Sequence, residues 1–202
     1  MGVAEIDGAA RGATALLIID MINDLDFPSG GRMLPEALRA AQAIVRLREQ
    51  ARAAGVPVVY VNDNYGQWHS ERSLIVEHCA REGSAGREMV DLLRPEEGDF
   101  FVIKPQFSGF YSTNLPALLP RLGASRLILT GVAADICVLF TAADAHMREY
   151  ELWVPSDCVA SSDRQRTEWA LDIMANGMKA ETRPSSEGGL EDWLGRAEPA
   201  AP

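Results

Sequence analysis

Residues 127–138 read LILTGVAADICV. The segment opens with the apolar run Leu127–Leu129, passes through Thr130 and Gly131, and then takes on the composition of an apolar helix. A short apolar run that ends at a glycine turn is typical of a buried strand feeding directly into a helix. The segment therefore predicts a strand, a tight turn and a helix that begins near Asp135.

Similar apolar runs recur on both sides of this segment. They are continuous rather than alternating, so each is expected to be a strand buried on both faces of a sheet. The predicted strands are Ala15–Ile19, Val56–Val61, Phe100–Ile103, Leu127–Leu129, Leu152–Val154 and, as the weakest, Met178–Thr182.

Helical patterns fill the intervals between these runs, and Pro35 suits the first turn of one of them. The alternation predicts βαβ units, and hence an α/β fold with a parallel sheet between helix layers. We expect one domain over residues 1–202, with residues 1–12 and 196–202 as tails. The predicted helices are Pro35–Ala54, Ser70–Arg81, Ala85–Arg94, Thr113–Leu122, Asp135–Glu149, Asp163–Asn176 and Leu190–Leu194.

Composition excludes several classes of protein. Hydrophobic residues make up 47% and charged residues 24% of the 202 residues, which favours a globular chain over a disordered one. The net charge of −10 disfavours nucleic acid and anionic membrane surfaces as partners, because both need clustered lysine and arginine. No apolar run approaches the roughly 20 residues of a membrane span, and residues 1–12 lack the apolar centre of a secretory leader. The 3 cysteines have no disulfide or metal spacing, so we expect a cytoplasmic location.

Common catalytic motifs are absent from the sequence. The residues after the first strand, DMIN (20–23), are not the glycine-rich loop of a dinucleotide site. The chain also lacks a G-x-x-x-x-G-K-[ST] phosphate loop, an H-E-x-x-H zinc motif and the G-x-S-x-G turn of α/β-hydrolases. These absences disfavour NAD enzymes, P-loop enzymes, zinc proteases and serine hydrolases.

Three reactive residue types follow predicted strands. Asp20 ends the first strand, Lys104 ends the third, and Cys137 lies at the start of the helix after the fourth. Parallel strands bring such positions to one sheet edge, where α/β proteins bind their ligands. Each residue alone is more often structural: a turn aspartate, a solvated lysine, a buried cysteine. Together they predict a catalytic group in which the aspartate takes the thiol proton and later gives it to a leaving amine.

The position of Cys137 also predicts its acidity. A helix N-terminus presents free N–H groups and a positive dipole end. Those groups and the Lys104 ammonium favour the thiolate, so we expect the pKa of Cys137 to fall from about 8.5 toward 7 or below. The alternative is a Cys–Asp pair that shares one proton. The same N–H groups are suited to hold an oxyanion.

Three segments of the chain resemble one known family. They are LLIIDMINDLDFPSG (16–30), FFVIKPQFSGFYSTNL (100–115) and LILTGVAADICVLFTAADA (127–145). They resemble the first-strand, central-lysine and nucleophile signatures of the isochorismatase-like cysteine hydrolases, a superfamily that includes nicotinamidases and N-carbamoyl amidases. The resemblance covers about residues 14 to 185.

The resemblance carries expectations about fold, chemistry and assembly. It implies a three-layer α/β/α domain with a six-stranded, mostly parallel sheet of Rossmann-like topology. It implies a triad of Asp20, Lys104 and Cys137 that hydrolyses C–N bonds through a thioester. It further implies a cis peptide between Val132 and Ala133, an oxyanion hole formed by the backbone N–H groups of Ala133 and Cys137, and a homodimer or homotetramer.

A metal site is not expected. Nicotinamidases bind a metal through an Asp-x-His pair and a later histidine after the second strand. Here Asp63 matches the aspartate, but Tyr65 stands at the first histidine position, and His69 and His78 are poorly spaced replacements. We therefore predict neither a metal nor a cofactor, and Asp63 is expected to be a loop residue or a support for the site.

The substrate pocket is predicted from residues near the strand ends. Aromatic side chains gather there, either as a wall for an apolar substrate or as a subunit interface, and asparagines offer amide contacts. A further departure is Ile22, which replaces the family's usual glutamine and removes one polar contact. The predicted pocket residues are Asn23, Phe27, Asn64, Tyr65, Trp68, Phe107, Phe110 and Tyr111.

Three functions remain open at this stage. The first is a metal-independent cysteine hydrolase that cleaves a C–N bond of a small amide or ureido compound. The second is a vinyl-ether hydrolase of isochorismatase type, with Asp20 as the acid and Cys137 as a bystander. The third is a non-enzymatic binding or redox protein in which Cys137 is oxidised, although no resolving cysteine lies nearby in sequence.

Overall fold

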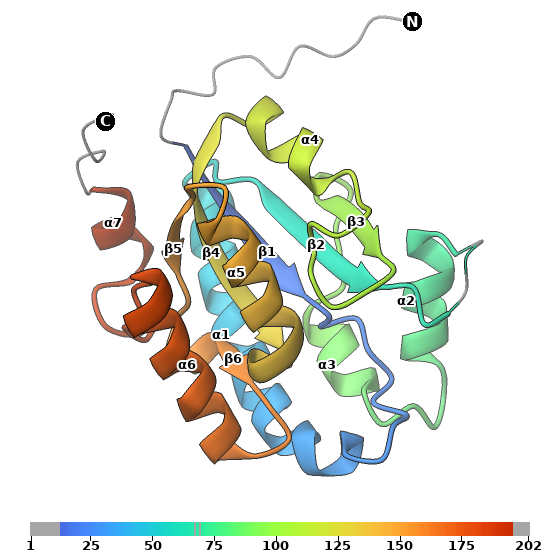
Figure 1. The fold of residues 1–202 in the computed structure, drawn as a ribbon. Helices are drawn as coiled ribbons and strands as arrows, with labels where there is room; N and C mark the ends of the chain where they lie inside the picture. The colour runs from blue at the N-terminus through green and yellow to red at the C-terminus, as the bar shows by residue number, and fades with distance from the viewer. Residues whose placement is uncertain (1–12, 67, 69, 196–202) are drawn as a thin grey trace, which may run out of the picture.

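The computed structural model describes residues 13–66, 68 and 70–195, so the predicted tails lie outside the described residues. Within this range, 6 strands form one parallel sheet in the order β3-β2-β1-β4-β5, and β6 pairs with β4. Helices cover both faces of the sheet (Figure 1), which confirms the predicted three-layer α/β/α fold. The strands are β1 (Ala13–Ile19), β2 (Val58–Asp63), β3 (Phe100–Lys104), β4 (Ala124–Val132), β5 (Glu151–Trp153) and β6 (Val159–Ala160).

The helices occupy the predicted intervals with shifted ends. The first begins at Gly30, so Pro35 does not lie in its first turn as predicted. Because proline has no N–H, Pro35 cannot donate the usual helical hydrogen bond to the Gly31 carbonyl. Gly31 is exposed, so water can hydrogen-bond to this carbonyl instead. The helices are α1 (Gly30–Ala53), α2 (Arg72–Ala80), α3 (Arg87–Leu92), α4 (Leu115–Arg121), α5 (Leu139–His146), α6 (Arg164–Met178) and α7 (Gly189–Leu194), with a π-helical turn η1 (Ala134–Val138) and a 3₁₀ turn η2 (Ser156–Cys158).

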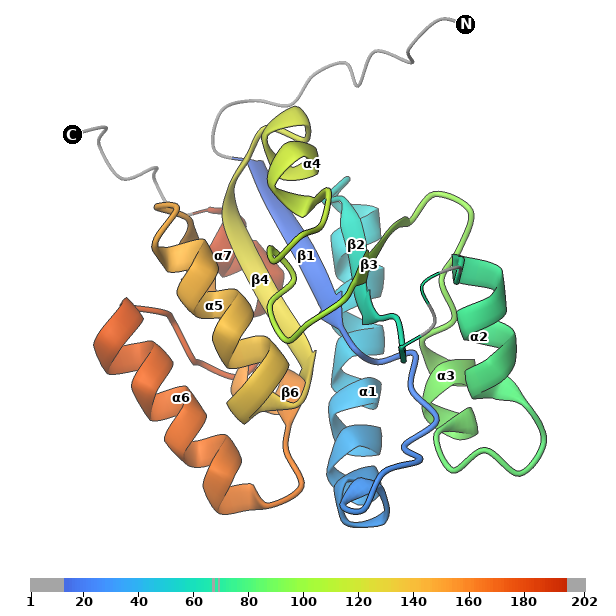
Figure 2. The same cartoon turned by 45° about the vertical axis from the view of Figure 1, so that its right-hand side comes forward.

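The two faces of the sheet bury two separate apolar cores. In β1, Leu16 and Ile18 belong to a core shared with α1, α2, α3 and α7. Leu17 and Ile19 belong to the other core, shared with α4, α5 and α6 (Figures 1 and 2). Alternate side chains of a strand point to opposite faces, so a strand covered on both sides needs the continuous apolar run seen in the sequence. No helix in the described ranges has both the length and the apolar character needed to cross a membrane.

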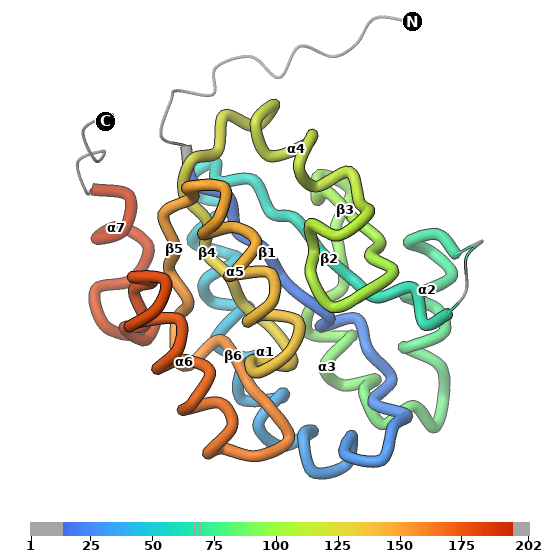
Figure 3. The backbone as a smooth tube through the Cα atoms, in the orientation of Figure 1, coloured from blue at the N-terminus to red at the C-terminus, as the bar shows by residue number. Residues whose placement is uncertain are grey.

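The sixth strand lies elsewhere than predicted. Residues 178–182 form only an isolated parallel bridge, in which Glu181 pairs with Trp153 of β5, because α6 runs on to Met178 and the chain then reverses through Lys179, whose φ is 55°. The sixth strand is instead β6, only 2 residues long. It pairs with β4 through Gly131 and Val132, beyond the part of β4 that β5 reaches. Figure 3 traces the chain from β5 through β6 into α6.

Strand register brings the predicted site residues to one edge. Ile19, the last residue of β1, pairs with Val61 on one side and Gly131 on the other. On the next strand pair, Asp63 lies opposite Lys104. The carboxyl ends of β1, β2, β3 and β4 therefore meet around Asp20, as expected for an α/β ligand site.

Gly131 allows the close approach of β1 and β4 at this edge. Its φ is +112°, and a Cβ there would lie 1.9 Å from the Ile19 carbonyl oxygen. A side chain at this position would push apart the two strands that lead into Asp20 and into η1. The glycine thus fixes the distance between the carboxylate and the turn that carries the cysteine.

Candidate active site

Three side chains converge at the carboxyl edge of the sheet. The Lys104 Nζ lies 2.8 Å from Asp20 Oδ2 and 3.5 Å from Cys137 Sγ. The Asp20 carboxylate and the Cys137 thiol also affect each other's pKa. Asp20 and Lys104 are buried, and Cys137 is half-buried. The Lys104 ammonium therefore contacts both a carboxylate and a thiol at the edge of a cavity.

The backbone around Asp20 holds its carboxylate in place. Asp20 adopts a left-handed φ of 52°, and its N–H donates to the Val61 carbonyl at 3.0 Å. Its Oδ1 accepts the N–H of Asp63 at 2.8 Å, which leaves Oδ2 for Lys104. A left-handed conformation in a residue other than glycine is uncommon, and it turns this side chain away from the strand direction toward its neighbours.

Burial dominates the electrostatics of the group. Burial raises the pKa of Asp20 above its ordinary value, although Lys104 and Cys137 lower it in part. For Lys104, burial lowers the pKa, but the charges of Asp20 and Cys137 outweigh this and leave the pKa raised. Near neutral pH the ammonium therefore stays charged and stabilises the carboxylate beside it.

The predicted low pKa of Cys137 is wrong. Burial raises the pKa of this thiol well above its usual range, Asp20 raises it further, and Lys104 offsets only part of the increase. The resting group therefore consists of a thiol, a carboxylate and an ammonium. The alternative drawn from the sequence, a cysteine and an aspartate that share one proton, agrees with the raised pKa of both.

Cys137 lies in a π-helical turn rather than in the first turn of the long α-helix that was predicted. The N–H groups of Ile136 and Val138 both donate to the Ala133 carbonyl at 3.1 Å. The Cys137 N–H lies between them and, among the described residues, donates to no acceptor outside this turn. The peptide bond between Val132 and Ala133, just before this turn, is cis.

A cavity of about 520 Å³ opens in front of the reactive group. Four of the predicted pocket residues line it: Asn23, Phe27, Tyr65 and Phe107. Asp20, Cys137 and both residues of the cis peptide line it as well. The cavity thus gives a small molecule direct access to the thiol.

The other predicted pocket residues do not line this cavity. Asn64 is buried, and its Oδ1 accepts the Gly66 N–H at 2.9 Å within the turn after β2. Phe110 is 3% exposed and packs in the core against Tyr150, whereas Trp68 and Tyr111 point into solvent with 76% and 59% of their surface exposed. The homodimer or homotetramer stays a prediction.

Comparison with known proteins identifies the family. The isochorismatase domain model matches residues 14–184. The chain belongs to the isochorismatase family. It is 41% identical over 167 residues to the isochorismatase family protein YaaI of Bacillus subtilis, covering 83% of this chain and 91% of that one. It is 30% identical over 163 residues to the ureidoacrylate amidohydrolase RutB of Methylorubrum extorquens, covering 68% of this chain and 66% of that one. The structure of N-carbamoylsarcosine amidase from Thermoplasma acidophilum superposes with a TM-score of 0.67 at 33% identity, covering 87% of this chain and 98% of that one.

This isochorismatase-family chain differs at the place where nicotinamidases hold a metal. The Tyr65 hydroxyl donates to the Ile22 carbonyl at 2.6 Å, and His78 contacts Asp24 at 3.0 Å, away from the cavity lining. Asp63 lines the cavity with one carboxylate oxygen 3.6 Å from Lys104 Nζ. Among the described residues, no group of three histidine, cysteine or acidic side chains is placed to hold a metal ion. His69, one of the two replacements considered from the sequence, lies outside the described residues.

Sequence reasoning missed one whole side of the isochorismatase-family cavity. The missed residues come from the starts of α1 and α6 and from η1, whereas Asp63, expected to support the site, lines the cavity from β2. Recognising β6 would have placed Ser162 just beyond a strand end, by the same rule that found Asp20. The missed lining residues are Ser29, Arg32, Met33, Asp135, Ile136, Ser162 and Arg166.

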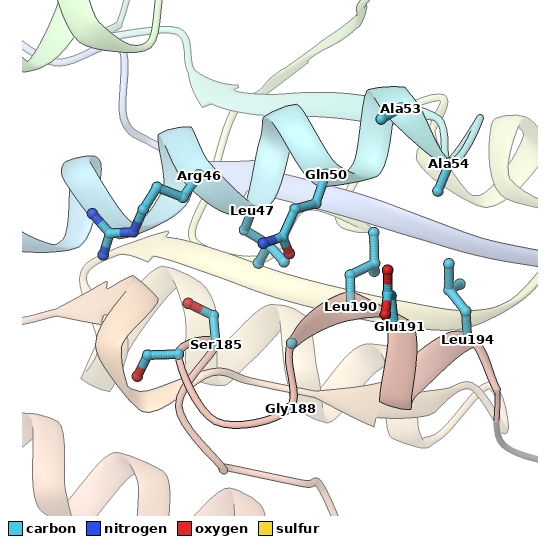
Figure 4. A pocket seen from close by; sticks show the side chains of 12 residues that line it. Arg46, Leu47, Gln50, Ala53, Ala54, Ser185, Gly188, Leu190, Glu191 and Leu194 are labelled. Atoms are coloured by element: carbon cyan, nitrogen blue, oxygen red, sulfur yellow. The ribbon is translucent and has the colours of Figure 1, made fainter.

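A second cavity of about 650 Å³ lies between α1 and the segment that leads into α7 (Figure 4). Leu47 and Gln50 of α1 face Leu190 across it. It shares no lining residue with the cavity in front of Cys137. Because it contains none of the converging groups, the candidate active site of this isochorismatase-family protein is the cavity at the strand ends.

Proposed function

We propose that this protein is a metal-independent cysteine hydrolase that cleaves a C–N bond of a small amide or ureido compound. The observation that carries the proposal is the convergence of Lys104 Nζ on Asp20 at 2.8 Å and on Cys137 at 3.5 Å, at a cavity of about 520 Å³. Relatives named for amide or ureido substrates, ureidoacrylate amidohydrolase and N-carbamoylsarcosine amidase, support the same bond type.

The first half-reaction forms a thioester. Asp20 takes the proton of Cys137 as Sγ attacks the substrate carbonyl carbon, so that thiolate forms only during the attack. The backbone N–H groups of Cys137 and Ala133 stabilise the oxyanion that develops on the carbonyl oxygen. Asp20 then gives its proton to the leaving nitrogen, the C–N bond breaks, and the amine or ammonia departs.

The second half-reaction regenerates the thiol. A water molecule attacks the thioester carbon while Asp20 accepts one of its protons. The C–S bond breaks, the carboxylic or carbamic acid product leaves, and the proton returns from Asp20 to Sγ. Lys104 keeps Asp20 ionised between proton transfers, because a buried carboxylate without a cation would take up a proton.

A raised pKa for Asp20 also suits a second candidate, the vinyl-ether hydrolase. In that reaction the aspartate would have to be protonated at rest and donate its proton to the substrate. The Lys104 ammonium at 2.8 Å opposes this state, which favours the amide reaction.

The direct test is a screen for ammonia release from a library of small amides and ureido compounds. The expected result is turnover of at least one compound by the unmodified protein and none by a Cys137→Ala blank. A library without a single Cys137-dependent substrate, tested on protein that retains its fold, would contradict the proposal.

The pH dependence of kcat/KM should follow the ionisation of Asp20. As a base, Asp20 must be ionised, so activity should rise with pH through a midpoint above the ordinary value of 3.8. The pKa of Lys104 is raised above 10.5, so no loss of activity from its deprotonation is expected at moderately alkaline pH. An activity that instead falls as pH rises toward neutrality would assign Asp20 the role of an acid and favour the vinyl-ether reaction.

A further inference from the structure

Two arginines line the same cavity as the thiol, and they come from different helices. Arg32 lies in the first turn of α1 and Arg166 in the first turn of α6. Figure 1 shows both helix starts at the same end of the molecule, beyond the tips of β1 and β4, and Figure 2 agrees. Neither arginine contacts the triad in the described structure, so the mechanism above leaves both without a role.

The charges around the two arginines do not cancel. The Arg166 Nε donates to the carboxylate of Asp135, which the Ser161 hydroxyl also contacts. Arg32 forms no ion pair or side-chain hydrogen bond within the described ranges. Arg32, Arg166 and Asp135 therefore leave one unpaired positive charge on this wall of the cavity. Two guanidinium groups facing one cavity also repel each other, and a bound anion relieves that repulsion.

At the strand ends the excess charge is negative rather than positive. Asp20 and Asp63 are both close to Lys104, at 2.8 Å and 3.6 Å, so this cluster carries an excess negative charge. The cavity is thus polarised, with its positive excess at the helix starts and its negative excess beside the thiol. A substrate that is anionic at one end and neutral at its reacting carbonyl matches this polarity.

We propose that Arg32 and Arg166 bind a carboxylate of the substrate, so that the enzyme acts on small amides or ureido compounds that are themselves carboxylic acids. The inference rests on the proposed function and narrows its substrate class. A guanidinium group presents a planar fork of N–H donors that fits a carboxylate. With Nε of Arg166 held by Asp135, the terminal nitrogens of that arginine remain for the ligand.

A single carboxylate fits better than a phosphate. Three carboxylates of the protein itself line the cavity, from Asp20, Asp63 and Asp135. A dianion would be repelled by them, whereas one negative charge equals the excess on the arginine wall. Met33 and Ile136 add apolar side chains to the lining, and such side chains suit a short carbon spacer in the substrate.

The test uses matched pairs of acid and methyl ester. The probes are the N-carbamoyl derivatives of glycine, β-alanine and γ-aminobutyrate and the monoamides of malonate, succinate and glutarate, each also as its ester. For the best pair, kcat/KM from ammonia release should favour the acid, and Arg32→Gln should reduce that preference about 10-fold to 100-fold, as expected for a lost charge-assisted hydrogen bond. Arg166→Gln should act in the same direction.

The matched control is Arg39→Gln, on the same helix. Arg39 forms an exposed pair with Glu36 and does not line the cavity, so its loss should change neither rate nor preference. Equal turnover of acid and ester by the unmodified protein, or an equal loss of both in Arg32→Gln, would overturn the carboxylate site.

Calorimetric binding of the same pairs to Cys137→Ala protein separates the two proposals. Binding of an acid in preference to its ester, abolished by Arg32→Gln, supports the carboxylate site even if no probe is turned over. Turnover that depends on Cys137 without any acid preference overturns the carboxylate site and leaves the proposed function intact. If the protein shows no acid-selective binding and no probe is turned over, both the carboxylate site and the proposed function are overturned.

Discussion

Replacing Cys137 by alanine or serine should lower the rate of amide hydrolysis at least about 10³-fold, the usual cost of losing a catalytic nucleophile. Alanine removes the only protein atom that bonds to the substrate carbon in the proposed reaction. Serine keeps the shape of the side chain, but its hydroxyl is a weaker nucleophile, and Asp20 and Lys104 are arranged around a thiol. The rate of ammonia release under substrate-saturating conditions measures the effect.

The same variants distinguish the three functions that the sequence leaves open. A vinyl-ether hydrolase would keep its rate in Cys137→Ser, because Asp20 alone carries that reaction. A redox protein would show no turnover before substitution, and the variant would lose only oxidation at this position.

The control for these variants is Cys158→Ala. Cys158 is buried, contacts Ser185 and Asp157, and does not line the cavity, so its loss tests the general effect of removing a thiol. Its kcat should remain within a few-fold of the unmodified protein, as expected for a site with no shared contacts. An equal loss in Cys158→Ala and Cys137→Ala would mean that folding rather than chemistry explains both.

The convergence of Asp20, Lys104 and Cys137 could be predicted because it depends on two simple regularities. Continuous apolar runs mark strands covered on both faces, and parallel strands bring their following residues to one edge. Neither regularity requires knowledge of any side-chain contact. The family resemblance then added the expected cis peptide between Val132 and Ala133 and the expected oxyanion hole to residues already singled out.

The features that could not be predicted depend on distances that only the folded chain sets. The burial that raises the pKa of Cys137 cannot be read from the neighbouring sequence. The helix start and the lysine, which lower this pKa, can be predicted from the sequence. The two-residue strand β6 is too short to show a pattern, so the cavity wall that it leads into, including Arg166, was missed. Phe110 and Tyr111 are neighbours in sequence, yet one is in the core and the other in solvent.

Replacing Lys104 by methionine should destabilise the protein by about 3–5 kcal/mol, the typical cost of leaving one partner of a buried ion pair without the other. Lys104 is fully buried, and its ammonium lies 2.8 Å from Asp20 and 3.6 Å from Asp63. Methionine keeps the length of the apolar stem but removes the charge that stabilises Asp20. Urea denaturation, followed by circular dichroism, measures the loss.

The loss should depend on pH in a direction fixed by Asp20. Lys104 lowers the pKa of this carboxyl, so its removal should raise that pKa further above the unfolded value of 3.8. A raised pKa in the folded state means that folding favours the protonated carboxyl. The loss of folding stability is therefore complete at pH values above the folded-state pKa of Asp20. It shrinks as the pH falls toward the pKa of Asp20 in the unfolded state. The variant should therefore recover part of its stability in mild acid, relative to the unmodified protein at the same pH.

Two further variants test whether the ion pair causes the effect. The double substitution Asp20→Asn with Lys104→Met removes both charges and should recover most of the lost stability, although both reactive groups are then gone and activity is not expected. Lys179→Met is the matched control, because Lys179 is exposed and its replacement should change stability by less than about 0.5 kcal/mol. If the double variant is as unstable as Lys104→Met alone, the loss comes from packing of the lysine stem, and the ammonium is not what holds the Asp20 carboxylate in its ionised form.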